Sequence, residues 1–197
     1  MPDNVSKQAF VAVRPMCRAD VDALAAWGRH SDPLFFQYNV PVLTSGDADE
    51  LWTELNRDPA RRRPFVGLEG ERVVASLIVR HTAPRAGEGE LGIILDPACI
   101  GRGLGRRILD AFVAVLAAEG FRRLHLEVAG YNGRALAAYR AAGFAVIDDY
   151  WADPEPGIDP ASLLDGGGAD SQPPNVRLDA DGNYRMRVVR MERRLTP

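Results

Sequence analysis

Three alternating glycines in residues 96–105 (DPACIGRGLG) stand directly before a long, mostly apolar run, RRILDAFVAVLAAEG. Glycine accepts positive φ and lets the backbone approach a ligand without a Cβ atom in the way. We expect a strand to end before these glycines and a helix to begin near Leu104, which directs unpaired amides and the positive end of the helix dipole to one point. Arg102, Arg106 and Arg107 add positive charge. The segment therefore predicts a loop that binds a pyrophosphate.

The spacing of Gly101, Gly103 and Gly105 distinguishes this loop from two common phosphate-binding patterns. A dinucleotide fingerprint needs glycine at position 106, where the chain has Arg106, and the Walker pattern is absent. An ordinary tight turn is the alternative, and the neighbouring sequence has to decide between the two.

A second block, at residues 132–144, follows the alternating segment RLHLEVAG. Asn132 suits the N-cap of a short helix and Gly143 the position after its end, while Leu136 and Tyr139 share one face. Taken alone, the block predicts a capped helix with Tyr139 in the core.

Together the two blocks resemble the GNAT superfamily of N-acetyltransferases. The first resembles its acetyl-CoA loop, and the second has its N-x-x-A-x-x-x-Y-x-x-x-G-F signature, with the same order and separation. The segments ELGIILDP and DGNYRMRVVRMER are most similar to the branch that includes ribosomal-protein alanine N-acetyltransferases. Ile100 departs from the pattern, because Gln or Arg is usual three residues before the central glycine.

The resemblance implies acetyl-CoA as co-substrate and direct attack of an amine on its thioester. It also implies that Tyr139 gives a proton to the leaving thiolate and that a backbone amide near Ile94 and Leu95 polarises the thioester carbonyl. The residues that it implies in cofactor binding are Ile94, Leu95, Gly101, Arg102, Gly103, Leu104, Gly105, Arg106, Arg107, Asn132 and Tyr139.

For the base that deprotonates the amine, we expect Glu90 at the start of the strand ELGIILD, where related enzymes often carry a carboxylate facing the acceptor. His125 and Glu127 share a face of the next strand, and either could relay the proton through water. A solvated Glu90 and a structural His125 are the alternatives.

The expected fold is α+β, with the GNAT architecture of a mixed, mostly antiparallel twisted sheet of about six to seven strands flanked by helices. Alternating and turn-bounded segments predict strands at residues 10–14, 64–69, 72–80, 90–96, 124–130, 144–147 and 184–195. Helical spacing predicts helices at 18–28, from a Ser45 or Asp47 cap to about Asn56, from Leu104 onward and around Tyr139.

One N-acetyltransferase domain is expected over residues 9–197, preceded by a disordered segment at 1–8. Residues 151–183 are rich in Pro, Gly and Asp and are interpreted as an insertion. This insertion is either a flexible loop without a function or an acidic flap. Such a flap would cover the acceptor groove, and its charge would favour a cationic amine there.

Composition narrows the function classes. A net charge of −3 provides no basic surplus for nucleic acid, and the arginines at 61–63 are interpreted as a solvated turn. No apolar run approaches the roughly 18 residues of a membrane span, and no signal peptide is recognised, so we expect a cytoplasmic protein. Cys17 and Cys99 are expected to be buried or half-buried thiols, without a metal site.

The sequence thus predicts transfer of an acetyl group from acetyl-CoA to a primary amine of a small molecule or a protein N-terminus, and it leaves a homodimer open. Phe35, Phe36, Tyr38 and the region of Trp151 either line the acceptor pocket or anchor loops to the core. The rival interpretations are an enzyme that uses another acyl-CoA, one that acetylates an aminoglycoside- or polyamine-like substrate, and a non-catalytic CoA-binding regulatory module.

Overall fold

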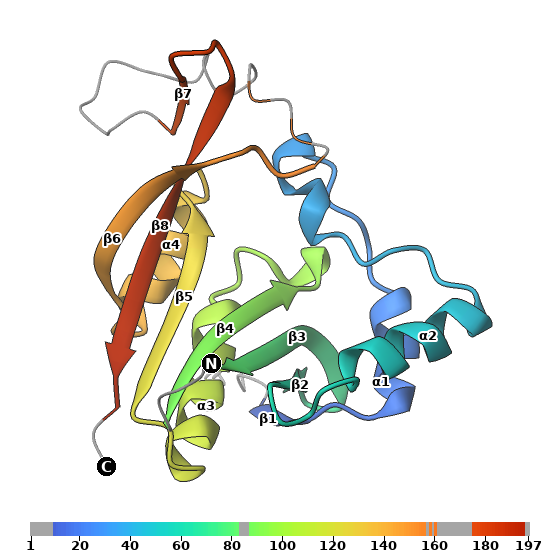
Figure 1. Cartoon of the computed structure of the whole chain (residues 1–197). Coiled ribbons are helices and arrows are strands. Elements are labelled where there is room, and N and C mark those ends of the chain that lie inside the picture. The colour runs from blue at the N-terminus through green and yellow to red at the C-terminus, as the bar shows by residue number, and fades with distance from the viewer. Residues whose placement is uncertain (1–9, 83–86, 157, 159, 161–174, 196–197) are drawn as a thin grey trace, which may run out of the picture.

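The computed structural model describes residues 10–82, 87–156, 158, 160 and 175–195. The predicted α+β fold is confirmed: one sheet has the strand order β1-β2-β3-β4-β5-β8-β6, with β7 paired to β8 (Figure 1). Neighbouring strands are antiparallel except for the parallel pair β4–β5. The strands are β1 (Val11–Pro15), β2 (Arg62–Glu69), β3 (Arg72–His81), β4 (Glu88–Leu95), β5 (Arg123–Ala129), β6 (Ala145–Ala152), β7 (Val176–Leu178) and β8 (Tyr184–Arg194).

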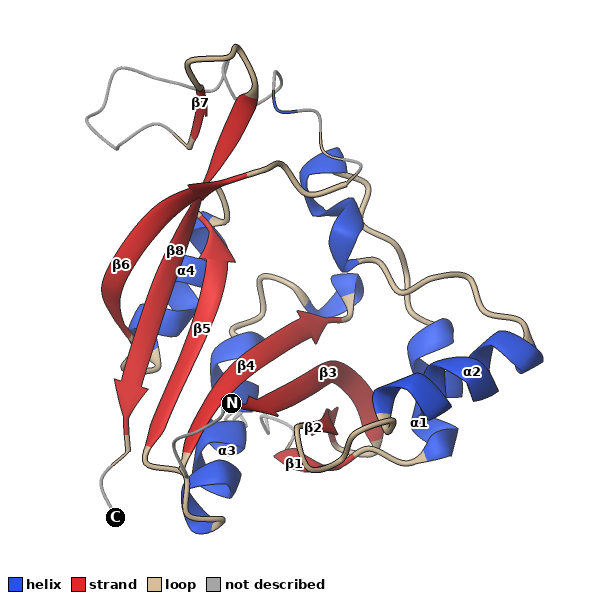
Figure 2. Ribbon diagram, viewed as in Figure 1, coloured by secondary structure: helices blue, strands red, loops and turns tan. Residues whose placement is uncertain are grey.

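Helices cover both faces of the sheet (Figure 2). They are α1 (Arg18–Ala25), α2 (Ser45–Leu55), α3 (Leu104–Ala118) and α4 (Gly133–Ala141), with two short 3-10 helices, η1 (Pro33–Tyr38) and η2 (Pro97–Cys99). Side chains alternate along a strand, so Phe65 of β2 packs with α3 while its neighbour Val66 packs with α1 and α2.

The larger core lies between the sheet and α3. Ile108, Phe112 and Leu116 follow helical spacing and are fully buried, and the rings of Phe65 and Phe112 lie 5.2 Å apart between centroids. Truncating a buried phenylalanine to alanine costs about 3–5 kcal/mol, so this contact fixes α3 firmly on the sheet. The start of α3 therefore has a defined position beside the end of β4.

The two halves of the sheet separate beyond Glu90. The parallel pairing of β4 and β5 covers only Glu88 to Glu90 against Arg123 to His125. Beyond these pairs β4 continues along β3 and β5 continues along β8, so that the ribbons of β4 and β5 splay apart (Figure 1). This opening exposes one backbone edge of β4.

Several predicted boundaries need correction. Thr44, rather than Ser45 or Asp47, caps α2, because Asp47 is the reciprocal partner of Thr44 in a capping box. Arg62 and Arg63 belong to β2 instead of a solvated turn, and Arg63 forms an ion pair with Glu119.

The predicted insertion at 151–183 is shorter at both ends. Strand β6 continues to Ala152, and β7 pairs with β8 inside the segment interpreted as a loop. Residues 157, 159 and 161–174 lie outside the described residues, as do the predicted disordered residues 1–8.

Candidate active site

The loop between β4 and α3, residues 96–103, is here called the glycine loop. Gly101 and Gly103 have φ values of 83° and 71°, as predicted, and a Cβ atom added at either would meet no atom within 4 Å. Gly103 is the N-cap of α3 and provides no side-chain cap, whereas side chains cap α2 and α4. The first turn of α3 therefore has amides that its N-cap residue does not bind, beside open space at the two glycines, and this arrangement suits an anion.

The third glycine has a different role from the one predicted. Gly105 lies inside the first turn of α3 and is not among the residues with positive φ. A Cβ atom there would lie 2.9 Å from Cδ1 of Leu95, so glycine lets the helix approach β4 closely. In the same turn Leu104 is buried in the core and Arg107 is half-buried.

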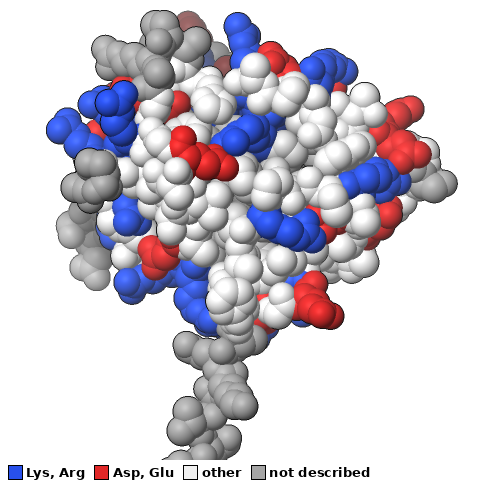
Figure 3. Space-filling view, turned by 90° about the horizontal axis from the view of Figure 1, so that it is seen from below, with Lys and Arg blue, Asp and Glu red and all other residues white. Residues whose placement is uncertain are grey.

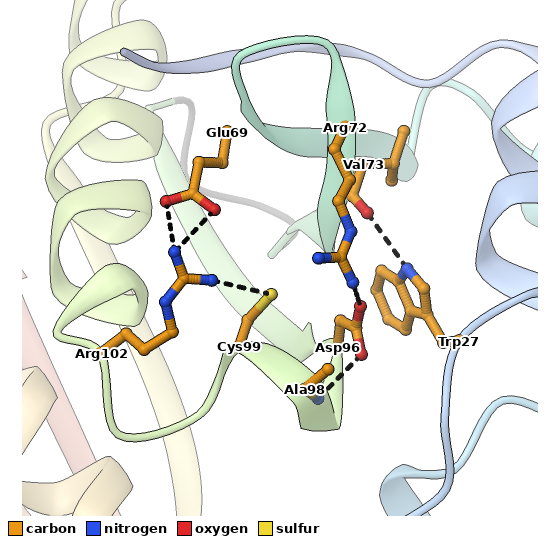
Figure 4. Close-up of polar contacts among 8 residues, drawn as sticks. All are labelled: Trp27, Glu69, Arg72, Val73, Asp96, Ala98, Cys99 and Arg102. Atoms are coloured by element: carbon orange, nitrogen blue, oxygen red, sulfur yellow. Dashed lines mark hydrogen bonds and ion pairs between the residues drawn. The ribbon is translucent and has the colours of Figure 1, made fainter. Parts of the chain in front are cut away.

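A buried carboxylate holds the glycine loop to β3 (Figure 4). Asp96 is 1% exposed, pairs with Arg72 and accepts a hydrogen bond of 2.9 Å from the amide of Ala98. The next residue of β3, Val73, accepts a hydrogen bond of 3.1 Å from Nε1 of Trp27. The loop and the segment after α1 are thus fixed to consecutive residues of one strand.

The arginines beside the loop are partly engaged by carboxylates. Nη2 of Arg102 lies 3.0 and 3.1 Å from the two oxygens of Glu69, and its Nη1 lies 4.0 Å from Sγ of Cys99 (Figure 4). Arg106 lies 3.6 Å from Asp110 one turn along α3, with both side chains about half exposed. The charge of Arg102 that was predicted to face a ligand is therefore balanced by Glu69.

Backbone geometry separates the two residues predicted to polarise a carbonyl group. The amide of Asp96 donates to the carbonyl of Val74 at 3.0 Å, and such pairs recur at every second residue of an antiparallel ladder. The amide of Ile94 therefore faces β3, while the amide of Leu95 faces the side that β5 has left beyond Glu90. The open edge of β4 fits Leu95 and not Ile94 as the backbone donor.

The second sequence block forms α4 as predicted. Oδ1 of Asn132 accepts a hydrogen bond of 3.1 Å from the amide of Ala135 and caps the helix. The ring of Tyr139 packs against that of Phe144, with centroids 6.2 Å apart. Burial raises the pKa of Tyr139 to about 12, so the phenol stays protonated at neutral pH.

Glu90 and His125 lie side by side on the face of the sheet opposite α3. Nε2 of His125 is 4.0 Å from a carboxylate oxygen of Glu90, and Nη1 of Arg80 donates to the other oxygen at 3.1 Å. The Glu90 side chain is 38% exposed, so water reaches it. These contacts place a solvated carboxylate at the point where β4 and β5 begin to separate.

Glu127, the other predicted carboxylate, is engaged by two donors. It accepts a hydrogen bond of 2.8 Å from the hydroxyl of Tyr150 and one of 2.8 Å from Nη2 of Arg190. It therefore has less free acceptor capacity than Glu90.

A model of the acetyltransferase (GNAT) family matches residues 23–144, which is more than half of the chain. The chain belongs to the GNAT family.

Curated relatives match this GNAT chain only locally. A mycothiol acetyltransferase from Beutenbergia cavernae is 43% identical over 65 residues, which are 32% of this chain and 22% of the relative. A second one, from Amycolatopsis mediterranei, is 44% identical over 57 residues, 28% of this chain and 19% of the relative. The chain thus spans about a fifth of the length of the curated relatives that it matches.

Solved structures match over nearly the whole chain. Spermidine N-acetyltransferase from Vibrio cholerae, in complex with CoA and spermine, has a TM-score of 0.66 at 16% identity and covers 93% of this chain and 95% of that one. Ribosomal-protein-alanine N-acetyltransferase from Brucella melitensis has a TM-score of 0.60 at 17% identity, with 93% and 99% covered. At such identities the likeness shows the fold.

No helix in the described part of the chain has the length and apolar character needed to cross a membrane. On the face seen from below, basic and acidic side chains are interspersed rather than gathered into a basic patch (Figure 3).

A cavity of about 400 Å³ lies between η1, the end of β5, β6 and β8. The residues that matter for its chemistry are Tyr38, Tyr131, Tyr150, Glu127, Asp153 and Glu155. Tyr131, Tyr150, Asp153 and Glu155 were not singled out in the sequence. The only signal for Tyr131 was its place directly before Asn132, and Glu155 was one of many acidic residues in its segment.

The aromatic residues before α2 divide between the two predicted roles. Tyr38 lines the cavity, whereas Phe35 anchors the loop, with its ring 6.2 Å from that of Tyr131 and the guanidinium of Arg134 4.9 Å above it. Phe36 is 45% exposed.

Two further sequence predictions concern residues that do not line the cavity. Trp151 stacks under the guanidinium of Arg177 at 4.3 Å and is absent from the cavity wall. Cys99 is buried, but Cys17 is exposed, contrary to the prediction, because it is the N-cap of α1.

Hydrogen bonds join η1 to the start of α4. Nε2 of Gln37 donates to the hydroxyl of Tyr131 at 2.7 Å, and this hydroxyl donates to the carbonyl of Leu34 at 3.1 Å. The cavity wall is thereby connected to the helix that carries the signature tyrosine.

Proposed function

We propose that the protein transfers an acetyl group from acetyl-CoA to a primary amine of a small molecule or of a protein N-terminus. The observation that carries this proposal is the uncapped N-terminus of α3, which follows the two positive-φ glycines at the end of a splayed strand. Helix α4 packs against α3 and brings Tyr139 to the same part of the fold. Membership of the GNAT family supports the same reaction.

The glycine loop fits the pyrophosphate of acetyl-CoA. Open space beside Gly101 and Gly103 leaves room for phosphate oxygens against backbone amides, and the start of α3 supplies further donors. Arg106 and Arg107 add charge at the helix surface, while Arg102 contributes its backbone amide, since Glu69 binds its side chain. The residues proposed to hold the co-substrate are Leu95, Gly101, Arg102, Gly103, Leu104, Gly105, Arg106, Arg107, Asn132 and Tyr139.

The co-substrate supplies an acetyl group activated as a thioester. In a direct transfer the amine nitrogen bonds to the acetyl carbon while the bond from that carbon to sulfur breaks. The amide of Leu95 on the open edge of β4 is the proposed donor to the carbonyl oxygen. Tyr139, held protonated by burial, is the proposed donor to the departing sulfur.

Glu90 is the proposed acceptor of the proton that the amine loses. Its half-exposed carboxylate allows transfer directly or through one water molecule, and His125 lies next to it. Glu127 is a weaker candidate because Tyr150 and Arg190 already bind it.

The decisive test measures acetyl transfer itself. Purified protein is mixed with acetyl-CoA and one acceptor at a time, and the release of free thiol is followed. The mass of the product is then measured by mass spectrometry. The panel contains alkylamines, polyamines and peptides that begin with alanine, because the spermidine and ribosomal-protein-alanine enzymes with this fold differ in their named acceptors. We expect amine-dependent thiol release and a product heavier by one acetyl group.

Two results would contradict the proposal, one from this test and one from repeating it with other acyl-CoA thioesters. Tight acetyl-CoA binding without amine-dependent thiol release would indicate a CoA-binding regulatory module. Faster turnover with another acyl-CoA would identify a different acyl donor. The cytoplasmic location and the homodimer stay predictions.

A further inference from the structure

The segment after β6 forms a roof over the acceptor-side cavity. Residues 153–156 lead from β6 toward η1 (Figure 1), and Asp153 and Glu155 line the cavity. Just beyond them, Ile158 is buried in a small apolar cluster with Leu34 and Tyr131 packed against it. This cluster fastens the roof to η1 and to the start of α4, so its carboxylates have a defined place.

The one guanidinium among the residues that line the cavity is neutralised. Nε of Arg187 donates to a carboxylate oxygen of Asp149 at 2.9 Å, and its Nη2 contacts the same oxygen. The Arg187 side chain is only 19% exposed, so this pair is held in place by its surroundings. The wall therefore presents no unbalanced positive charge from this residue.

Three carboxylates line the same cavity, and they differ in their partners. Glu127 is paired with Arg190, and Asp153 is paired with Arg185, which also pairs with Asp179. Within the described residues, the carboxylate of Glu155 has no hydrogen-bonding or ion-pair partner. Among the described residues that line the cavity, Glu155 is thus the carboxylate without an ion-pair partner, and it lies at the roof.

Tyrosine side chains surround this charge. Tyr38 and Tyr131 line the cavity together with Glu155. Burial is the main reason why the pKa values of both tyrosines are raised, and the negative charge of Glu155 raises them further. The hydroxyl of Tyr131 is already used in a hydrogen bond to the carbonyl of Leu34. A carboxylate beside aromatic rings matches an ammonium group, through a charge-assisted hydrogen bond and cation–π attraction.

We infer that this cavity binds a second cationic group of the acceptor, and that Glu155 is the carboxylate that holds it. The inference rests on the proposed acetyltransferase function and names its substrate class: linear diamines and other amines with a second positive charge at a distance from the reacting nitrogen. Tyr131 joins the two ends of the site, since it lines the cavity and directly precedes Asn132, the N-cap of the helix that carries Tyr139. The reacting amine lies toward Tyr139 and the second ammonium toward Glu155.

The test compares linear α,ω-diamines with alkylamines of the same carbon number. For each pair, kcat/KM is measured by thiol release at saturating acetyl-CoA, and binding to the CoA-loaded protein is measured by calorimetry. We expect the preferred diamine to exceed its alkylamine by about tenfold or more in both measurements, the effect of one charge-assisted hydrogen bond. In Glu155→Gln this preference should disappear, with the values for the alkylamine unchanged. Glu50→Gln, the same chemical change on an exposed residue of α2, should retain the preference.

The outcomes separate this inference from the proposed function. Equal kcat/KM and binding for diamines and alkylamines, or a preference that persists in Glu155→Gln, would overturn the inference while acetyl transfer stands. Diamine binding that depends on Glu155, without turnover of any amine, would support the site and contradict the transferase. A loss of the preference in Glu50→Gln as large as that in Glu155→Gln would reduce the effect to overall charge and overturn the inference.

Discussion

Replacing Gly103 with alanine should weaken acetyl-CoA binding far more than it weakens the fold. An alanine at φ 71° costs about 1–2 kcal/mol of backbone strain. Alanine also restricts the unfolded chain, and this effect offsets up to ~1 kcal/mol of that cost. No further steric cost is expected, since the new Cβ meets nothing within 4 Å in the free protein. The net loss in the free energy of unfolding is therefore about 1 kcal/mol, or roughly 2–4 °C in Tm.

The same methyl group occupies the space where we place the pyrophosphate. Displacing one or two charge-assisted hydrogen bonds lowers affinity by about 10- to 100-fold. At one hundred times the wild-type Kd, acetyl-CoA stabilises the wild type by about 2.7 kcal/mol, and this gain should fall to about 0.4–1.4 kcal/mol in Gly103→Ala. Calorimetric unfolding with and without acetyl-CoA measures both effects, and isothermal titration gives the affinity directly.

Gly182 provides a matched control, because its φ is 80° and an added Cβ there also meets nothing within 4 Å. Gly182→Ala, in the turn before β8, should lose similar stability and keep full affinity. Gly103→Asn should restore stability, since asparagine tolerates the left-handed region, while affinity stays low. Wild-type affinity in Gly103→Ala would refute the assignment of the glycine loop.

Three further predictions concern the chemistry and the fold. Tyr139→Phe should lower kcat by about 10- to 1000-fold with acetyl-CoA affinity nearly unchanged, as measured by thiol release and titration, because it removes only the proton donor. Glu90→Gln should remove the acidic limb from the pH profile of kcat/KM, since glutamine cannot accept the proton. Burial alone would raise the pKa of Asp20, but hydrogen bonds from Arg14 and from the amide of Cys17 outweigh it and lower this pKa in the folded state. The stability contributed by Asp20 is therefore present above its unfolded pKa of about 3.9 and is lost as pH falls through the lower folded value; Asp20→Asn should flatten this acid limb of stability in urea titrations.

Each of these three predictions has an outcome that would contradict it. Unchanged kcat in Tyr139→Phe would reduce that residue to packing. A limb that survives in Glu90→Gln and disappears in His125→Ala or Glu127→Gln would transfer the role of base. An acid limb of stability equally steep in Asp20→Asn and in the wild type would contradict the ion pair with Arg14 as its source.

The parts of the site that sequence predicted well are those set by local spacing. The positive φ of Gly101 and Gly103, the cap at Asn132 and the position of Tyr139 each depend on residues within one turn or one helix. Gly105 shows the limit of this reasoning. Its place in the alternating pattern suggested a turn, but its glycine is required by contact with Leu95, which lies on another element.

Contacts between segments that are distant in the sequence could not be predicted from the spacing of residues. Arg102 and Glu69 are 33 positions apart, and nothing in either neighbourhood indicates that they pair. Tyr131 and Leu34 are 97 positions apart, so the bond that joins η1 to the start of α4 depends on the whole fold. The cavity follows from such contacts, and for that reason its roof at Glu155 could not be separated in the sequence from other acidic residues.

Strand β7, which was not predicted from the sequence, also depends on a contact with another element. Strand β7 has only three residues, and it forms because β8 offers it a paired edge. An isolated segment of this length carries no strand signal, and the Pro- and Gly-rich residues before it indicated a loop.

The most direct test of the account is amide-resolved hydrogen exchange with and without saturating acetyl-CoA. We predict slower exchange of the backbone amides of residues 102–107 and of Leu95, with little change at Gly182 in the turn before β8. Saturation with acetyl-CoA that leaves these amides unchanged and protects a different segment would contradict the proposed binding site and the mechanism built on it.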